Sequence, residues 1–345
     1  MLQTDSRNVT LLGIVHFCVD FCCTALLTQA AVGLDGRTVM LCALLYNGAA
    51  FAFQLPIGAL GDVFGLQKGL ACAGCFLIAI GGLMHEPILL CLLIGLGNAC
   101  FHIGGGREAL KRGGTEAALV GKFVAPGAIG IFLGPRISVS GWQMPCMLLC
   151  GAALLLTRSD RLPNMYGGKP RMSRLRLFAV VACMFLTILL RSYIGTILKY
   201  DFMRTSWLSL LFALCVFLGK YHGGVLADRL GTLRFSFPAQ ILCVLLLSLS
   251  PIWPVLAFQG ILLFNTTMAV TTSRLYVCAP GYPGTMFGLT TFALYLGVIP
   301  RLLKWNSRLF SIGGLLLLTG ISAFLLWAGL ALSENTEVSN DCDRA

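Results

Sequence analysis

The chain has 345 residues, of which 57% are hydrophobic and only 11% are charged, and its formal net charge is +11. Soluble domains carry about 25% charged residues, so the composition excludes an ordinary soluble protein and predicts a surface that faces lipid. The positive charge could indicate a nucleic-acid-binding protein. However, Lys and Arg lie between the apolar runs and form no stripe interleaved with aromatic residues, so we expect no nucleic-acid partner.

The apolar runs predict the membrane spans. A spanning helix needs about 20 apolar residues, so the chain has room for about twelve helices joined by short loops. We place them at residues 10–32, 39–60, 69–84, 87–101, 117–138, 142–156, 177–198, 207–224, 235–250, 252–272, 283–303 and 309–332. The sequence therefore predicts an all-α integral membrane protein with twelve transmembrane helices.

Lys and Arg are concentrated in alternate loops, which predicts that both termini are cytoplasmic in a multi-pass protein of the cell inner (plasma) membrane. The stretch 157–176 is rich in Pro, Gly and basic residues and lies near the middle of the chain. We therefore expect an N-terminal six-helix bundle at 1–156, a basic cytoplasmic linker at 157–176, a C-terminal six-helix bundle at 177–333 and a polar tail at 334–345.

A repeated motif supports two related halves. It follows the second and eighth spans, with Gly58, Asp62, Gly65 and Lys68 in the first copy and Gly224, Asp228, Arg229, Gly231 and Arg234 in the second. Glycines let two helix ends approach closely, while Asp can cap a neighbouring helix and pair with a basic residue. We predict a gating latch that holds one conformation and releases it when the halves rock.

This repeat resembles the loop signature of the major facilitator superfamily, which implies two pseudosymmetric bundles. The first copy departs from the signature at Val63, where a basic residue is usual, and this departure predicts a weaker first latch. The fifth span resembles the antiporter signature of the same superfamily through its small residues, which predict close helix packing. They are Gly121, Gly130, Gly134 and Pro135.

A narrower resemblance is to the fosmidomycin-resistance branch. The segments that carry it are 16–21 (HFCVDF), 95–102 (GLGNACFH), 123–135 and 190–192 (LRS). The branch implies proton-coupled export of small, often anionic compounds. After His102, however, this chain has Ile-Gly-Gly-Gly where the branch usually has Pro-Glu, so a carboxylate is missing.

Ionisable residues within a span are costly and are candidates for function. Asp20 lies near the middle of the first span, and His16 lies one helical turn earlier on the same face. We predict that Asp20, with His16, carries the coupled proton. The alternative is a structural hydrogen-bonded pair.

Arg191 in the seventh span is the candidate anion-binding residue, because a guanidinium binds a phosphonate or carboxylate in bidentate fashion. The alternative is an interhelical ion pair, for which Asp20 is one partner. Further candidates for substrate binding are neutral or weakly basic side chains of the second, fourth and tenth spans, each of which could instead be interhelical glue. They are His102, Asn98, Tyr46, Asn47, Gln54 and Asn265.

These observations predict a secondary active transporter that exports a small organic compound, anionic by the resemblance, in exchange for protons by alternating access. The alternative is proton-coupled uptake by symport. A non-transporting sensor and an integral membrane enzyme are less favoured. We expect no enzyme activity, metal or cofactor; the expected partners are a small-molecule substrate, protons and the lipid bilayer, and the expected state is a monomer.

Overall fold

The computed structural model describes residues 2–65, 68–137, 141–156, 172–303, 305 and 309–342, and it leaves aside the side chains of residues 2–5, 68 and 335–342. Most of the expected linker, residues 157–171, lies outside the described residues. The side chain of Lys68 lies outside them too.

The described residues form helices joined by short connections. In the first half they are α1 (Leu2–Ala30), α2 (Gly36–Asn47), the π-helix η1 (Gly48–Ala52), α3 (Gln54–Phe64), α4 (Lys68–Gly81), α5 (Pro87–Gly113), α6 (Ala118–Leu133) and α7 (Gln143–Leu156). In the second half they are α8 (Arg174–Ile197), the 3-10 helix η2 (Asp201–Arg204), α9 (Ser206–Leu230), α10 (Thr232–Leu249), α11 (Leu256–Asn265), α12 (Thr267–Cys278), α13 (Pro283–Leu302) and α14 (Ile312–Cys342).

Within the described residues, these helices make up the twelve predicted spans. Eight continuous helical segments are long and apolar enough to cross a membrane, and α4, α6 and α7 are shorter apolar helices. The remaining span is formed by α11 and α12, which follow each other with one residue between them. The all-α, twelve-helix prediction is therefore confirmed, although α5 continues to Gly113, well past the predicted end at residue 101.

The chain divides into two compact units. Unit 1 comprises residues 1–112, 122–164 and 283–295, and unit 2 comprises residues 113–121, 165–282 and 296–345. The first turn of α6 thus belongs to unit 2, and the first part of α13 belongs to unit 1. Each of these helices therefore contributes residues to both units.

In unit 1, α1 and α5 are the central helices. Inside the apolar windows of both, 67% of the residues are buried, against 28% in the helical run from Gly36 to Phe64. Polar side chains on the buried faces of α1 and α5 are consequently shielded from most water. The buried face of α1 holds His16 and Asp20, the two residues predicted to carry the proton, and that of α5 holds Asn98 and His102.

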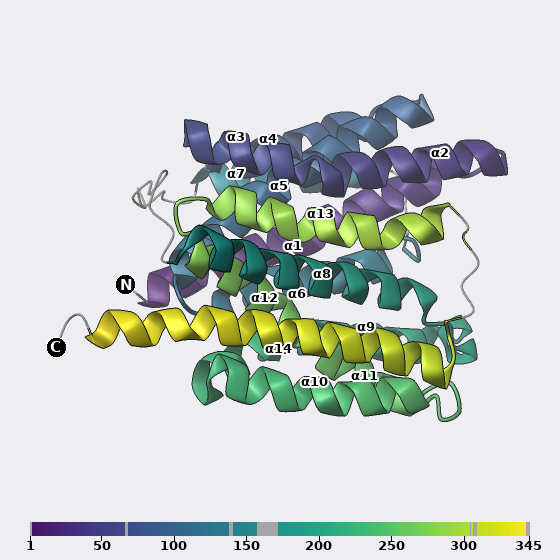
Figure 1. Ribbon diagram of the computed structural model, residues 1–345. Helices are drawn as coiled ribbons and strands as arrows, with labels where there is room; N and C mark the ends of the chain where they lie inside the picture. Colours follow the sequence, from purple (N-terminus) through teal and green to yellow (C-terminus); the bar gives the residue numbers. More distant parts are fainter. Residues whose placement is uncertain are drawn as a thin grey trace. The chain divides into compact units, whose positions relative to one another are not determined.

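In unit 2, α14 packs along α8 and α10, as Figure 1 shows. Its core includes Ile194, Leu247, Phe264 and Leu315, all 3% exposed or less. The outer faces of α10 and α14 instead carry exposed apolar side chains, such as Leu245 at 54%. Large apolar side chains on the outside of a helical bundle are expected where lipid is the solvent.

Both copies of the repeated motif end their helices on a glycine with a positive φ. The angle is 67° at Gly65, directly after α3, and 91° at Gly231, directly after α9. Side chains with a Cβ rarely adopt this backbone conformation, whereas glycine adopts it at little cost. The last glycine of the motif is therefore required by the turn that ends the helix.

Candidate functional site

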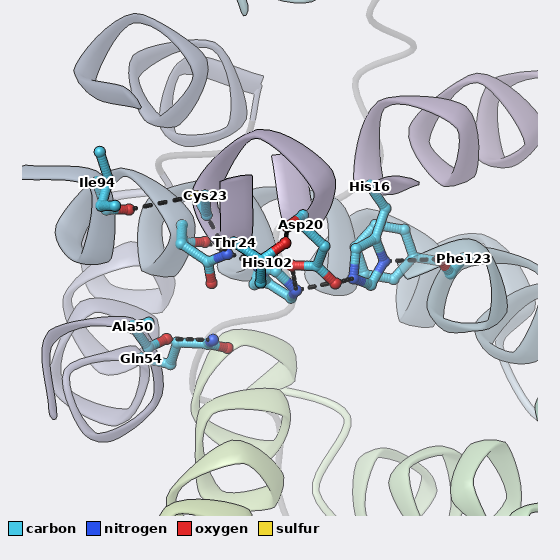
Figure 2. Close-up of polar contacts among 10 residues, drawn as sticks. His16, Asp20, Cys23, Thr24, Ala50, Gln54, Ile94, His102 and Phe123 are labelled. Atoms are coloured by element: carbon cyan, nitrogen blue, oxygen red, sulfur yellow. Dashed lines mark hydrogen bonds and ion pairs between the residues drawn. The ribbon is translucent and has the colours of Figure 1, made fainter. Parts of the chain in front are cut away.

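The polar cluster at the centre of unit 1 is formed by α1 and α5. His16 and Asp20 lie one turn apart on α1, and Asn98 and His102 lie one turn apart on α5. None of the four is more than 7% exposed. Figure 2 shows the side chains of His16, Asp20 and His102 meeting between the two helices.

Asp20 receives contacts on both carboxylate oxygens. His16 Nε2 lies 3.1 Å from Oδ2, and His102 Nε2 lies 3.8 Å from Oδ1. Asn98 Nδ2 donates to the same Oδ1 at 3.2 Å. The carboxylate therefore has a histidine on each side, within a region that excludes most water.

The two histidines also contact each other, with their Nε2 atoms 2.8 Å apart and their rings at 83°. On the far side of each ring, Nδ1 faces a main-chain carbonyl: Phe123 O at 2.8 Å for His16, and Asn98 O at 2.9 Å for His102. Carbonyl oxygens only accept, so each Nδ1 carries a hydrogen. Both Nε2 atoms are thus directed toward one another and toward Asp20.

The same three side chains have the chemistry of metal ligands, and their ligand atoms lie within 4.8 Å of one another. In a tetrahedral zinc site, however, nitrogens bound at about 2.0–2.1 Å lie roughly 3.3 Å apart. The 2.8 Å between the two Nε2 atoms is shorter and matches a hydrogen bond. The geometry favours a proton between them.

A glycine of α6 leaves room for this cluster. A Cβ on Gly127 would collide with both Asp20 Oδ2 and His16 Nε2. Gly130 and Gly134, predicted to allow close packing, lie against the backbone of α1 at Phe17 and Phe21. The glycine spacing of the fifth span therefore brings α6 directly against the helix that carries Asp20, as the small-residue pattern predicted.

A cavity of about 480 Å³ opens beside Asp20, lined by residues of α1, α2, η1, α5 and α6, all within unit 1. Tyr46 and Asn47, two predicted binding residues, line it together with Thr24 and Phe51. The π-helix η1 lies in this wall, and π-helical segments inside α-helices are frequent at functional sites.

Two other predicted binding residues contact their own helices. Gln54 is fully buried, its Nε2 donates to Ala50 O at 2.6 Å, and it is not in the cavity lining. Asn265 Nδ2 donates to Ile261 O at 2.8 Å. The structure thus gives these amides backbone partners one turn away.

Arg191 lies in unit 2 on α8 and is 6% exposed. Its Nη1 donates to Thr267 Oγ1 at 2.9 Å, and its Nη2 lies 2.9 Å from Met268 Sδ. These are neutral partners on α12.

Both motif aspartates cap helix N-termini, the contact expected of Asp in this motif. Asp62 accepts from the backbone N–H groups of Gly284 at 2.9 Å and Thr285 at 2.7 Å, in the first turn of α13. Asp228 accepts from the N–H groups of Ala117 and Ala118, both at 2.8 Å, at the start of α6. Negative charge is stabilised at a helix N-terminus, so each contact fixes two helices together.

The two caps differ in burial, and the expectation that Val63 weakens the first copy stays a prediction. Arg107 of α5 supplies the basic partner, with Nε 3.2 Å from Asp62 Oδ1, and both side chains are 1% exposed. Asp228, by contrast, is exposed. The first latch is therefore the more buried of the two.

The three glycines that follow His102 also have a structural reason. A Cβ on Gly104 would meet the backbone of Ala71, and one on Gly105 or Gly106 would meet an aromatic ring, that of Phe123 or Phe287. A carboxylate side chain has no space at these three positions of α5.

Three cysteines converge between α1 and α7. The sulfurs of Cys18, Cys146 and Cys150 lie within 4.8 Å of one another. Spacing along the chain gave no sign of this convergence, because it joins the first span to the sixth.

No protein-family model matches the sequence, and no curated protein matches it either. Solved structures do, among them two of similar length. One, described as the E. coli fucose:proton symporter FucP, has a TM-score of 0.68 at 12% identity and covers 95% of this chain and 98% of its own. The other, described as a major facilitator superfamily transporter, FucP, in the outward conformation, has a TM-score of 0.62 at 13% identity and covers 93% and 98%.

This chain has the major facilitator fold. Its apolar helices identify a multi-pass membrane protein, as predicted. At these identities the similarity concerns the fold alone. Many branches share the major facilitator fold, so the resemblance to the fosmidomycin-resistance branch stays a prediction.

Proposed function

We propose that this protein is a proton-coupled secondary transporter that works by alternating access, and that His16, Asp20 and His102 together carry the coupled proton. The observation that supports this most is the 2.8 Å contact between the two Nε2 atoms beside a buried carboxylate. Ionisable groups within a span are energetically costly. Where they occur, they mark a pathway for ions or substrates.

The number of protons follows from the hydrogen bonds. Because both Nδ1 atoms carry a hydrogen, two neutral rings would direct two lone pairs at each other across 2.8 Å. One further proton removes this repulsion and makes the histidine pair cationic, and the Asp20 carboxylate balances that charge. With one proton the cluster is neutral, and without it the cluster carries a buried negative charge.

The neighbours of the cluster are weak acids or neutral groups. On α1 they include Cys23, on α2 Tyr46 and on α5 Asn98, while α6 presents Gly127 and the carbonyl of Phe123. No additional fixed charge of a described residue contacts Asp20. The charge of the cluster therefore depends on its own protons, which suits a group that is loaded on one side of a membrane and unloaded on the other.

The latch segments suit a conformational role. Asp62 and Asp228 each hold the N-terminus of a helix from the opposite predicted half, α13 and α6. Releasing these caps would free two helices whose residues are divided between the compact units. We propose that they close and open during the transport cycle.

For direction, we propose export of a small organic compound by antiport, as predicted from the sequence, with uptake by symport as the alternative. The alternative has a specific support, since one structural neighbour is described as a fucose:proton symporter. We keep Arg191 as a contact for an anionic group. It is a buried guanidinium with neutral contacts to Thr267 and Met268, and Arg191→Lys should then weaken binding of any anionic substrate.

Proton flux tests the function. Inverted membrane vesicles expressing the protein would be challenged with a panel of small organic compounds, including fosmidomycin, while the internal pH is recorded. We expect a compound-dependent proton movement that Asp20→Asn abolishes. The control Leu149→Ala, at an apolar side chain of α7 that is 71% exposed, should leave it intact. Proton release from the vesicles indicates antiport and proton entry indicates symport; coupled flux that persists in Asp20→Asn removes this cluster from the mechanism.

A further inference from the structure

We propose that the cavity beside Asp20 binds an organic ammonium group, and that this cation displaces the proton held by His16, Asp20 and His102. The proposal rests on the proton-coupled function above and names the class of substrate for that site.

Within the described part of the chain, the wall of the cavity holds an acidic side chain and no basic one. Of the described residues that line it, Asp20 is the one acidic side chain, and none is Lys, Arg or His. A volume of about 480 Å³ accommodates a small organic molecule. An anion in this cavity would contact the Asp20 carboxylate directly, because the histidines that balance its charge do not line the wall.

The neutral polar groups of the wall present acceptors. The hydroxyl of Thr24 donates to Asp20 O at 2.7 Å, and that of Thr28 donates to Thr24 O at 2.8 Å. Each hydroxyl hydrogen is thus used within α1, and the oxygen lone pairs remain. Asn47 likewise donates from Nδ2 to Ala43 O at 2.8 Å, which leaves its carbonyl oxygen to accept.

The wall of the cavity also contains aromatic rings, which can contact a bound cation. Tyr46 and Phe51 belong to the same wall as Asp20. A ring face attracts a cation, and an ammonium supplies three donors to a wall of acceptors. Charge, hydrogen bonding and ring placement all favour the same ligand chemistry, a protonated amine with an apolar body.

Charge balance determines how many protons leave the cluster when an ammonium binds. The cluster with one proton is neutral, so an ammonium beside Asp20 would leave a net charge of one in a buried site. Loss of the proton shared by the two Nε2 atoms to water restores neutrality, with the ammonium nitrogen taking over the contact with the carboxylate. One cation is exchanged for one proton, and no net charge moves.

The prediction of an anionic substrate came from Arg191, which belongs to unit 2, and from the resemblance. An organic monocation and the ammonium end of a zwitterion share the chemistry proposed for the cavity. Matched probes distinguish them: phenethylamine is the cation, phenylalanine the zwitterion, phenylacetate the anion and 2-phenylethanol the neutral form of one phenyl-bearing body.

Binding of these four probes to the purified full-length protein would be measured by titration calorimetry in two buffers of different ionisation enthalpy, which counts released protons. We expect phenethylamine to bind at least about tenfold more tightly than phenylacetate and 2-phenylethanol, with about one proton released per molecule bound. Equal or tighter binding of phenylalanine, also with proton release, supports the proposal and assigns a zwitterion. Tightest binding of phenylacetate, or equal binding of all four probes, overturns it.

A variant outside the proton cluster keeps the test separate from the proposed function. Phe51→Leu should weaken phenethylamine binding about fivefold through loss of the ring contact, with the same proton count, whereas Leu149→Ala should change neither. If phenylacetate drives proton flux that Asp20→Asn abolishes, the ammonium proposal fails while the transporter proposal stands. If Asp20→Asn leaves every coupled flux intact, the proposed role of the cluster fails first.

Discussion

The Nε2 atoms of His16 and His102 lie 2.8 Å apart although 86 positions of the chain separate these residues. The contact exists because α1 and α5, whose apolar windows are both 67% buried, bring their polar residues together inside unit 1. Asp20 lies beside both rings. The carboxylate, the shared proton and the cavity therefore lie together, and the first prediction depends on this arrangement.

The first prediction concerns the space for the cluster. Gly127→Ala places a methyl group against Asp20 Oδ2 and His16 Nε2. Overpacking a buried site costs about 1–3 kcal/mol, and here it also separates the groups that share the proton. We expect loss of proton-coupled flux, measured in vesicles at matched expression. Gly320→Ala, where the added Cβ meets nothing within 4 Å, is the control and should retain flux; equal flux in both variants would show that α6 leaves more room than the structure indicates.

The second prediction compares the two latches. Asp62→Asn leaves the buried guanidinium of Arg107 without its carboxylate, and breaking a buried ion pair costs about 3–5 kcal/mol. Asp228→Asn affects an exposed cap, for which we expect about 0.5–2 kcal/mol. Unfolding in mixed detergent micelles measures both. A larger loss for Asp228→Asn would contradict the assignment of the first latch as the more buried contact.

The third prediction isolates the pairing within the first latch. Asp62→Asn, Arg107→Met and the double variant form a thermodynamic cycle. Because either single change leaves the other charge buried, we expect the double variant to be more stable than the sum of the single losses implies. Strict additivity would mean that the 3.2 Å contact contributes no coupling energy.

The fourth prediction tests the packing of α1 against α7. In a background with all other cysteines replaced by Ser or Ala, Cys18 and Cys146 should form a disulfide on mild oxidation, because their sulfurs lie within 4.8 Å. Mass spectrometry of the digested protein detects the cross-linked peptides. If oxidation yields no peptide joined through Cys18 and Cys146, this packing of α1 against α7 is contradicted.

The sequence predicted the twelve helices because apolar runs and polar interruptions are local features. It also placed Asp20 and His16 on one face, since their spacing matches a helical turn. The convergence with His102 could not be derived in this way, because it depends on which helices become neighbours. Thr24 lies one further helical turn from Asp20 and continues a polar stripe along α1 toward the cavity. This spacing could have been recognised in the sequence.

The role of Arg107, by contrast, could not be predicted from the sequence. Its sequence context, beside Glu108 and Lys111 at the end of a span, is typical of a charged helix terminus. Only the extension of α5 to Gly113 and its glycine-lined packing bring this guanidinium to Asp62 with 1% exposure. The basic partner that the first motif lacks at Val63 is therefore supplied by Arg107 of α5.

The proton shared by His16 and His102 can be observed most directly by nitrogen NMR of histidine-labelled protein in bilayers. The chain has four histidines, and His85→Gln with His222→Gln, both exposed, leaves the two of interest. At neutral pH the account predicts hydrogens on both Nδ1 atoms and a coupling between the two Nε2 nuclei through one hydrogen. Two unprotonated Nε2 atoms with no coupling between them would contradict it.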